Sequence, residues 1–76
     1  MDVEAARLIA AALCMGIGSI APALGEGRIA AQTMESIGRN PSVQSSLFPN
    51  MVVAMAITES TGIYALVISL IILFVA

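Results

Sequence analysis

Hydrophobic residues fill two long segments of the chain, and a short polar stretch separates them. The first segment runs from Leu8 to Gly25 without a charged residue, and the second runs from Met51 to Ala76 with a single carboxylate inside it. Each segment is long enough to cross a bilayer, because about 20 apolar helical residues span a hydrocarbon core of roughly 30 Å. The pattern therefore predicts two membrane-spanning helices.

The polar stretch Gly38–Ser42 predicts a tight connection between the two helices. Glycine and proline end the first helix here, and Ser45 or Ser46 can cap the second. The chain is thus predicted to be a single all-α membrane domain, a two-helix hairpin. Its expected parts are a first helix at about 4–38, a loop at about 39–45 and a second helix at about 46–76.

Composition supports the membrane assignment and excludes other classes. Of the 76 residues, 59% are hydrophobic and 11% are charged, whereas a soluble domain this short would need far more polar surface. The net charge of −2 and the absence of histidine and lysine argue against nucleic acid as a partner. Cys14 is the only cysteine, so we expect no disulfide within the chain, no metal cluster and no bound cofactor.

The three arginines indicate an orientation in the membrane. Arg28 and Arg39 flank the predicted loop, whereas Arg7 lies near Asp2 and Glu4 at the N-terminus. Lys and Arg are enriched on the cytoplasmic side of membrane proteins. We therefore expect the loop to face the cytoplasm of a bacterial cell, with both termini on the opposite side of the inner membrane.

Small residues form two adjacent stripes along the first helix. The first stripe contains Ala11, Cys14, Gly18, Ala21 and Gly25, and the second contains Ala12, Gly16, Ser19, Ala23, Gly27 and Ala30. Within a membrane, small residues let helices approach closely and pack by dispersion. A simple hairpin or dimer needs only one such seam. The broad face that both stripes form, with Gly16, Gly18, Gly25 and Gly27 as packing residues, favours a larger assembly of identical copies.

Glu59 is the central functional candidate. An acid in a membrane-spanning helix costs about 2.5–3.5 kcal/mol on insertion scales, so it normally faces protein or water and marks an ion path. Glu26 lies roughly 20 Å before Arg39, and Glu59 lies equally far beyond Ser46. The two carboxylates are therefore predicted to meet at one depth. The alternative for Glu26 is an ion pair with Arg28, although a separation of two residues is poor geometry on a helix.

Hydroxyl groups follow Glu59 along the second helix. Ser60 and Tyr64 are one turn apart and can serve as an ion ligand and a hydrogen-bond partner. The alternative for Ser60 and Thr61 is a hydrogen bond back to the preceding turn of their own helix, which is common in membrane helices.

The chain resembles the ring-forming c subunit of F-type ATP synthases over its whole length, through the loop residues Gly38-Arg39-Asn40-Pro41, the glycine-rich first helix and the carboxylate in the second. The resemblance implies a homo-oligomeric ring embedded in lipid, with the first helices inside. Glu59 would accept an ion beside the a subunit, and ring rotation would be coupled to ATP synthesis or hydrolysis. Arg39, Asn40 and Pro41 would contact the central-stalk subunits gamma and epsilon. The implied subunit transports ions and is not itself an enzyme.

The residues around Glu59 are similar to those of the sodium-type members of this family. There, the matching positions imply that Glu59, Ser60 and the Ile57 carbonyl bind the ion, that Thr61 holds a water and that Tyr64 orients the acid. Many of those members have glutamine at the position of Glu26. The second carboxylate of this chain resembles a two-carboxylate variant found among sodium-driven rings, although some proton-driven rings also carry two acids.

The charges at Glu26 and Glu59 narrow the choice of ion. Two carboxylates and one Na⁺ leave a net negative charge, which is costly in hydrocarbon. A proton shared by the two carboxyl groups would restore neutrality, and the pair would then titrate as one coupled unit. Na⁺ held by Glu26, Glu59, Ser60 and Ile57 together with one proton is the favoured hypothesis, and H⁺ alone is the other.

Two other classes of membrane protein fit the sequence less well. A small antiporter for ions or drugs can also contain an embedded glutamate, but it needs an aromatic-rich cavity for cations. This chain has no tryptophan, and Tyr64, Phe48 and Phe74 are scattered along it. A purely structural or lytic oligomer would not explain two acids at one depth.

Overall fold

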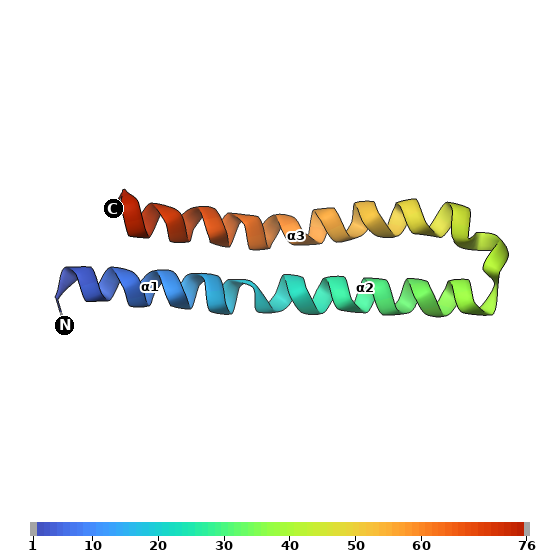
Figure 1. Ribbon diagram of the computed structural model, residues 1–76, viewed down its shortest axis with the longest axis horizontal. Helices are drawn as coiled ribbons and strands as arrows, with labels where there is room; N and C mark the ends of the chain where they lie inside the picture. Colours follow the sequence, from blue (N-terminus) through green and yellow to red (C-terminus); the bar gives the residue numbers. More distant parts are fainter. Residues whose placement is uncertain (1, 76) are drawn as a thin grey trace.

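Two antiparallel helical rods joined by a short turn make up the computed structural model, which describes residues 2–75 (Figure 1). The chain order is α1 (Val3–Gly18), α2 (Ile20–Arg39), the 3₁₀ turn η1 (Pro41–Val43) and α3 (Gln44–Phe74). α1 and α2 follow each other along one rod, and α3 returns beside them, in a molecule 58 Å long. The predicted all-α hairpin is confirmed, and the predicted end of the second helix at Ala76 lies outside the described residues.

A one-residue interruption at Ser19 divides the first rod, where the sequence predicted a continuous helix. The Ser19 N–H still donates to the Met15 carbonyl at 3.0 Å, and the Ala23 N–H donates to the Ser19 carbonyl at 3.1 Å. Pro22 has no N–H to donate to the Gly18 carbonyl, so the helix loses one hydrogen bond at this point. The proline therefore accounts for the interruption, and the rod continues beyond it.

The connection is shorter than predicted, because α3 begins at Gln44 and not near residue 46. Asn40 leaves helical geometry with φ −144° and ψ 84°, and Pro41 starts η1. The Ser42 hydroxyl donates to the Asn40 Oδ1 atom at 2.7 Å and stabilises the turn. Val43 precedes α3 without a side-chain cap, so the predicted serine cap is wrong; one of the two serines donates instead to a backbone carbonyl.

Small residues and two polar side chains join the rods. A methyl group at Gly18 would lie 2.7 Å from the Ala65 Cβ, so the backbones approach closely only because residue 18 is glycine. Ser69 in α3 donates to the Ala11 carbonyl across the interface at 3.3 Å, and Cys14 donates to the Ala65 carbonyl at 3.5 Å. These contacts set the register of α3 against α1.

Most large apolar side chains point away from the hairpin. Leu24 is 70% exposed and Phe74 is 78% exposed, whereas the buried apolar core of the described residues consists of Ala11 and Ala65. Both rods are long and apolar enough to cross a membrane. One hairpin therefore cannot cover its own apolar surface, and lipid or further copies must do so.

Candidate ion-binding site

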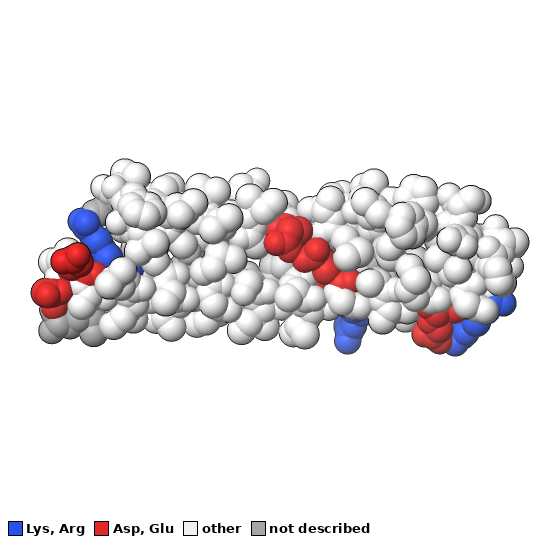
Figure 2. All heavy atoms as spheres, in the orientation of Figure 1, with Lys and Arg blue, Asp and Glu red and all other residues white. Residues whose placement is uncertain are grey.

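Glu26 in α2 and Glu59 in α3 meet near the middle of the hairpin. Their carboxyl groups lie within hydrogen-bonding reach of each other, and both side chains are partly exposed. Figure 2 shows an acidic patch at mid-length, well separated from the charged groups at the two ends. The structure thus brings together the two acids that the sequence placed at one depth.

Glycines on both helices make room for the carboxylate pair. Gly62 is buried one turn after Glu59, and a Cβ there would lie 3.1 Å from the Glu59 Oε1 atom. Gly25, next to Glu26, faces α3, where an added Cβ would lie 3.1 Å from the Thr58 methyl carbon. Gly62 was not among the predicted site residues, although its spacing of three residues from Glu59 was a usable signal.

The hydroxyl groups beside Glu59 bond to their own helix. The Ser60 hydroxyl donates to the Ile57 carbonyl at 2.6 Å, and the Thr61 hydroxyl donates to the Thr58 carbonyl at 3.0 Å. This is the back-bonding alternative that the sequence left open. The Ser60 and Ile57 oxygens nevertheless lie side by side, so an ion that contacts both would only require the hydroxyl to rotate its proton away.

Tyr64 points away from the body of the hairpin. Its side chain is 66% exposed, and the Ile57 side chain on the same helix is 68% exposed. A single copy therefore brings Glu26 and Glu59 together and places the Ser60 and Ile57 oxygens side by side on α3. A role for Tyr64 in orienting the acid, or for Thr61 in holding a water, remains a prediction for the assembled protein.

The two stripes of small residues have different surroundings. Gly18 and Gly25, in the first stripe, face α3 within the hairpin. A Cβ at Gly16 or Gly27, in the second stripe, would meet no atom within 4 Å. The second stripe is therefore open to a neighbouring copy, and the first is already used inside one hairpin.

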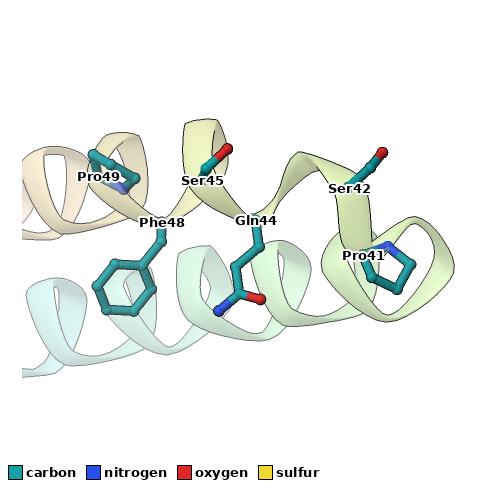
Figure 3. A pocket seen from close by; sticks show the side chains of 6 residues that line it. All are labelled: Pro41, Ser42, Gln44, Ser45, Phe48 and Pro49. Carbon is teal, nitrogen blue, oxygen red and sulfur yellow. The ribbon is translucent and has the colours of Figure 1, made fainter.

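The loop residues Arg39, Asn40 and Pro41 lie at the closed end of the hairpin, far from the acidic pair (Figure 1). All three are exposed, and Arg39 forms an ion pair with Glu35. Beside them is an open groove of about 510 Å³, in which the Phe48 ring points toward the first rod (Figure 3). The groove is lined by Pro41, Ser42, Gln44, Ser45, Phe48 and Pro49.

A membrane-spanning hairpin with paired carboxylates at mid-length defines a class, that of small integral membrane proteins that move ions. The family model for the C subunit of ATP synthase matches residues 9–72. The chain belongs to this family.

Curated relatives agree with the family match. The chain is similar to the ATP synthase c subunit of Petrotoga mobilis, with 49% identity over 69 residues that cover 91% of this chain and 72% of the relative. It is 43% identical to the c subunit of Dehalococcoides mccartyi over the full length of both chains. It is 44% identical to that of Thermotoga maritima over 91% of this chain and 81% of the relative.

Family membership establishes the general role of the chain. It is a rotor component of the membrane sector of an F-type ATP synthase, and membership implies a ring of identical copies. The protein translocates ions and is not catalytic, because ATP chemistry takes place in the F1 sector. The predicted resemblance to c subunits is confirmed, and the comparisons favour it over the antiporter and lytic alternatives.

Proposed function

We propose that Glu59 takes up and releases the transported ion as the ring turns, with Na⁺ as the favoured ion and H⁺ as the second candidate. The pairing of Glu26 with Glu59 at mid-length is the observation that carries this proposal. Embedded acids mark ion paths in membrane proteins. The carboxylate, hydroxyl and carbonyl oxygens near Glu59 are the kind of ligand that hard cations prefer.

The second carboxylate affects the charge of the loaded site. Na⁺ at Glu26 and Glu59 leaves one negative charge, which is costly away from water. Within one hairpin, a proton shared between the two carboxyl groups would cancel that charge, and the pairing of Glu26 with Glu59 supports such sharing.

The remaining partners follow from the same proposal. Glu59 would exchange its ion beside the a subunit, and lipid would cover the exposed apolar side chains of α3. The exposed loop at Arg39, Asn40 and Pro41 would contact gamma and epsilon of the central stalk from the cytoplasmic side. Each ion that crosses the membrane would contribute about 2.3 kcal/mol per 100 mV to rotation.

Carbodiimide labelling of purified rings tests the ion. The reagent modifies protonated carboxyl groups, so a bound Na⁺ should slow the modification of Glu59. We expect tens of millimolar Na⁺ to protect Glu59 at several pH values, with Glu59→Gln rings as the unlabelled control. Labelling that is insensitive to Na⁺ would exclude the sodium site and leave H⁺ as the ion.

A further inference from the structure

Arg28 is a cation within the first rod, on the loop side of its middle, and the described part of its own hairpin gives it no acidic partner. It lies two residues from Glu26 and about 16 Å before Arg39 along the helix. Its side chain is exposed, and the ion pair present among residues 2–75 joins Arg39 to Glu35. Its neighbours one turn away on α2 are uncharged: Leu24, Gly25, Ala31 and Gln32.

A lone arginine at this depth needs a partner. Insertion of a charged residue into the middle of a membrane helix costs about 2.5–3.5 kcal/mol, and such residues pair with opposite charges or face water. Glu26 and Glu59 are the acids at this level of the hairpin, and neither forms an ion pair with Arg28 of the same copy. A partner for Arg28 must therefore come from outside its own copy.

Glu26 and Arg28 lie on opposite edges of α2. Gly25 faces Thr58 of α3, which gives the direction of the second rod. Glu26 also reaches α3, through Glu59, and at about 100° per residue Arg28 lies about 160° from Glu26 around the helix. Figure 2 shows basic atoms near mid-length on the side of the first rod that faces away from the second rod, apart from the acidic patch.

Rotational symmetry brings these two edges together. Copies in a ring contact each other head to tail, so one edge of each copy meets the opposite edge of the next. With the first rods inside the ring, the Glu26 edge of one copy faces the Arg28 edge of its neighbour. The two residues differ in depth by about 3 Å, which is within the reach of an arginine side chain.

The Arg28 edge has space for a side chain from the neighbour. A hollow of about 310 Å³ is lined by Leu24, Gly25 and Arg28, and Gly25 has no side chain to fill it. The guanidinium group carries five donors in a planar fork that matches a carboxylate. Shape and charge at this hollow are therefore complementary to the Glu26 edge.

We propose that Arg28 of each copy pairs with Glu26 of the neighbouring copy, so that every ion site is completed by a residue from a second hairpin. This rests on the ring that family membership implies, and it deepens the proposed function. Two carboxylates, one guanidinium and one transported Na⁺ or H⁺ together have no net charge, so the extra shared proton becomes unnecessary. Glu26 is then held ionised by Arg28, and Glu59 is left as the residue that exchanges the ion.

Charge reversal of the purified ring tests the pair. Glu26→Arg or Arg28→Glu alone places like charges at every contact between copies, and we expect such rings to dissociate in a detergent gel that preserves the wild-type ring. The double variant Glu26→Arg/Arg28→Glu should restore the ring. The control Glu26→Arg/Arg39→Glu, which reverses an arginine outside the site, should not.

Chemical cross-linking provides a second test that needs no charged substitution. In a Cys14→Ser background, Glu26→Cys/Arg28→Cys rings treated with a short bis-thiol reagent should give a ladder of covalent multimers. Glu26→Cys/Ala30→Cys places both thiols on one edge of α2 and should give monomers. If wild-type rings form but neither the ladder nor the charge rescue is seen, the pair does not exist.

Two further outcomes distinguish the Arg28–Glu26 pair from the formation of the ring. Failure of the wild-type chain to form any ring would count against the assembly on which the pair depends. The proposed ion pair would also be overturned if Arg28 binds a lipid phosphate. In that case wild-type rings would retain an acidic phospholipid, Arg28→Gln rings would lose it, and the cross-linked rings would give no ladder of multimers.

Discussion

At the level of single residues, the Glu59 carboxylate occupies its place because Gly62 has no side chain. A Cβ at residue 62 would lie 3.1 Å from the Glu59 Oε1 atom, closer than ordinary contact distance. Gly62 is also buried in the helix pair, which leaves little freedom to move aside. The ion site therefore depends on a residue that contributes no ligand atom.

Gly62→Ala is expected to weaken ion binding without removing a ligand. The added methyl group forces the Glu59 carboxylate to shift from its place, at a cost of about 1 kcal/mol or more for overpacking. Na⁺ should then protect Glu59 from carbodiimide only at a concentration about tenfold higher or more. Gly38→Ala is the control, since a Cβ there meets nothing within 4 Å; equal protection in both variants would contradict the steric role.

Substitution of the two acids should have unequal effects. Glu59→Gln removes the exchangeable carboxylate, so ion-driven ATP synthesis in reconstituted vesicles should fall to background. Glu26→Gln leaves Glu59 in place and should retain transport with a changed pH dependence, because a charge beside Glu59 is lost. Equal loss of activity in both variants would show that Glu26 is as essential as Glu59.

At the level of elements, the contact between the rods relies on close approach more than on apolar burial. Gly18 lies against Ala65, and the hydroxyl of Ser69 reaches the Ala11 carbonyl between the helices. Small residues replace large ones at this seam because lipid provides no hydrophobic drive for helices to associate. The packing of α1 against α3 is therefore sensitive to the addition of a single methyl group.

Gly18→Ala is expected to separate α1 from α3. The new methyl group would lie 2.7 Å from the Ala65 Cβ, so the rods must shift, at a cost of the order of 1–3 kcal/mol. In detergent-solubilised monomers, the distance between labels on the two rods should increase, and less SDS should be needed to separate them. Gly16→Ala should leave both measurements unchanged, because a Cβ there meets nothing within 4 Å in the hairpin.

At the level of the whole molecule, the hairpin has an apolar exterior and only a thin core. Ala11, Ala65 and Pro22 are buried within the described range, while the large side chains face outward. Charged groups gather at both ends and at one mid-length level (Figure 2). Such a surface suits a copy that is surrounded by lipid on one side and by identical copies on the others.

The orientation of the molecule in the membrane can be tested at the loop. Because Arg28 and Arg39 lie toward the loop end, we expect the loop to face the cytoplasm. In a Cys14→Ser background, Ser42→Cys should react with a membrane-impermeant maleimide in inverted vesicles and stay unlabelled in intact spheroplasts. The opposite labelling pattern would reverse the assignment; Asp2→Cys, at the other end, serves as the matched control.

Much of the fold could be predicted because few backbone structures can cross a membrane. Apolar length predicts the two helices, and Gly38 and Pro41 predict the turn, since backbone polar groups must be satisfied within each spanning segment. The depth of Glu26 and Glu59 followed from the constant rise of a helix. The interruption at Ser19 follows from the missing N–H of Pro22. The early start of α3 at Gln44 was harder to predict, because it depends on hydrogen bonds in the turn that a residue pattern does not contain.

The sequence by itself determined the class of the protein, the hairpin and the common depth of its two acids, because these depend on hydrophobic length and helical rise alone. Only the tertiary structure showed that Gly18 and Gly25 are used inside the hairpin while Gly16 and Gly27 stay open. Spacing defines which residues share a face, but not which face meets which helix. The face of α2 that packs against α3 also determines that Glu26 and Arg28 lie on opposite sides of the hairpin. A contact between neighbouring copies can be predicted from this arrangement.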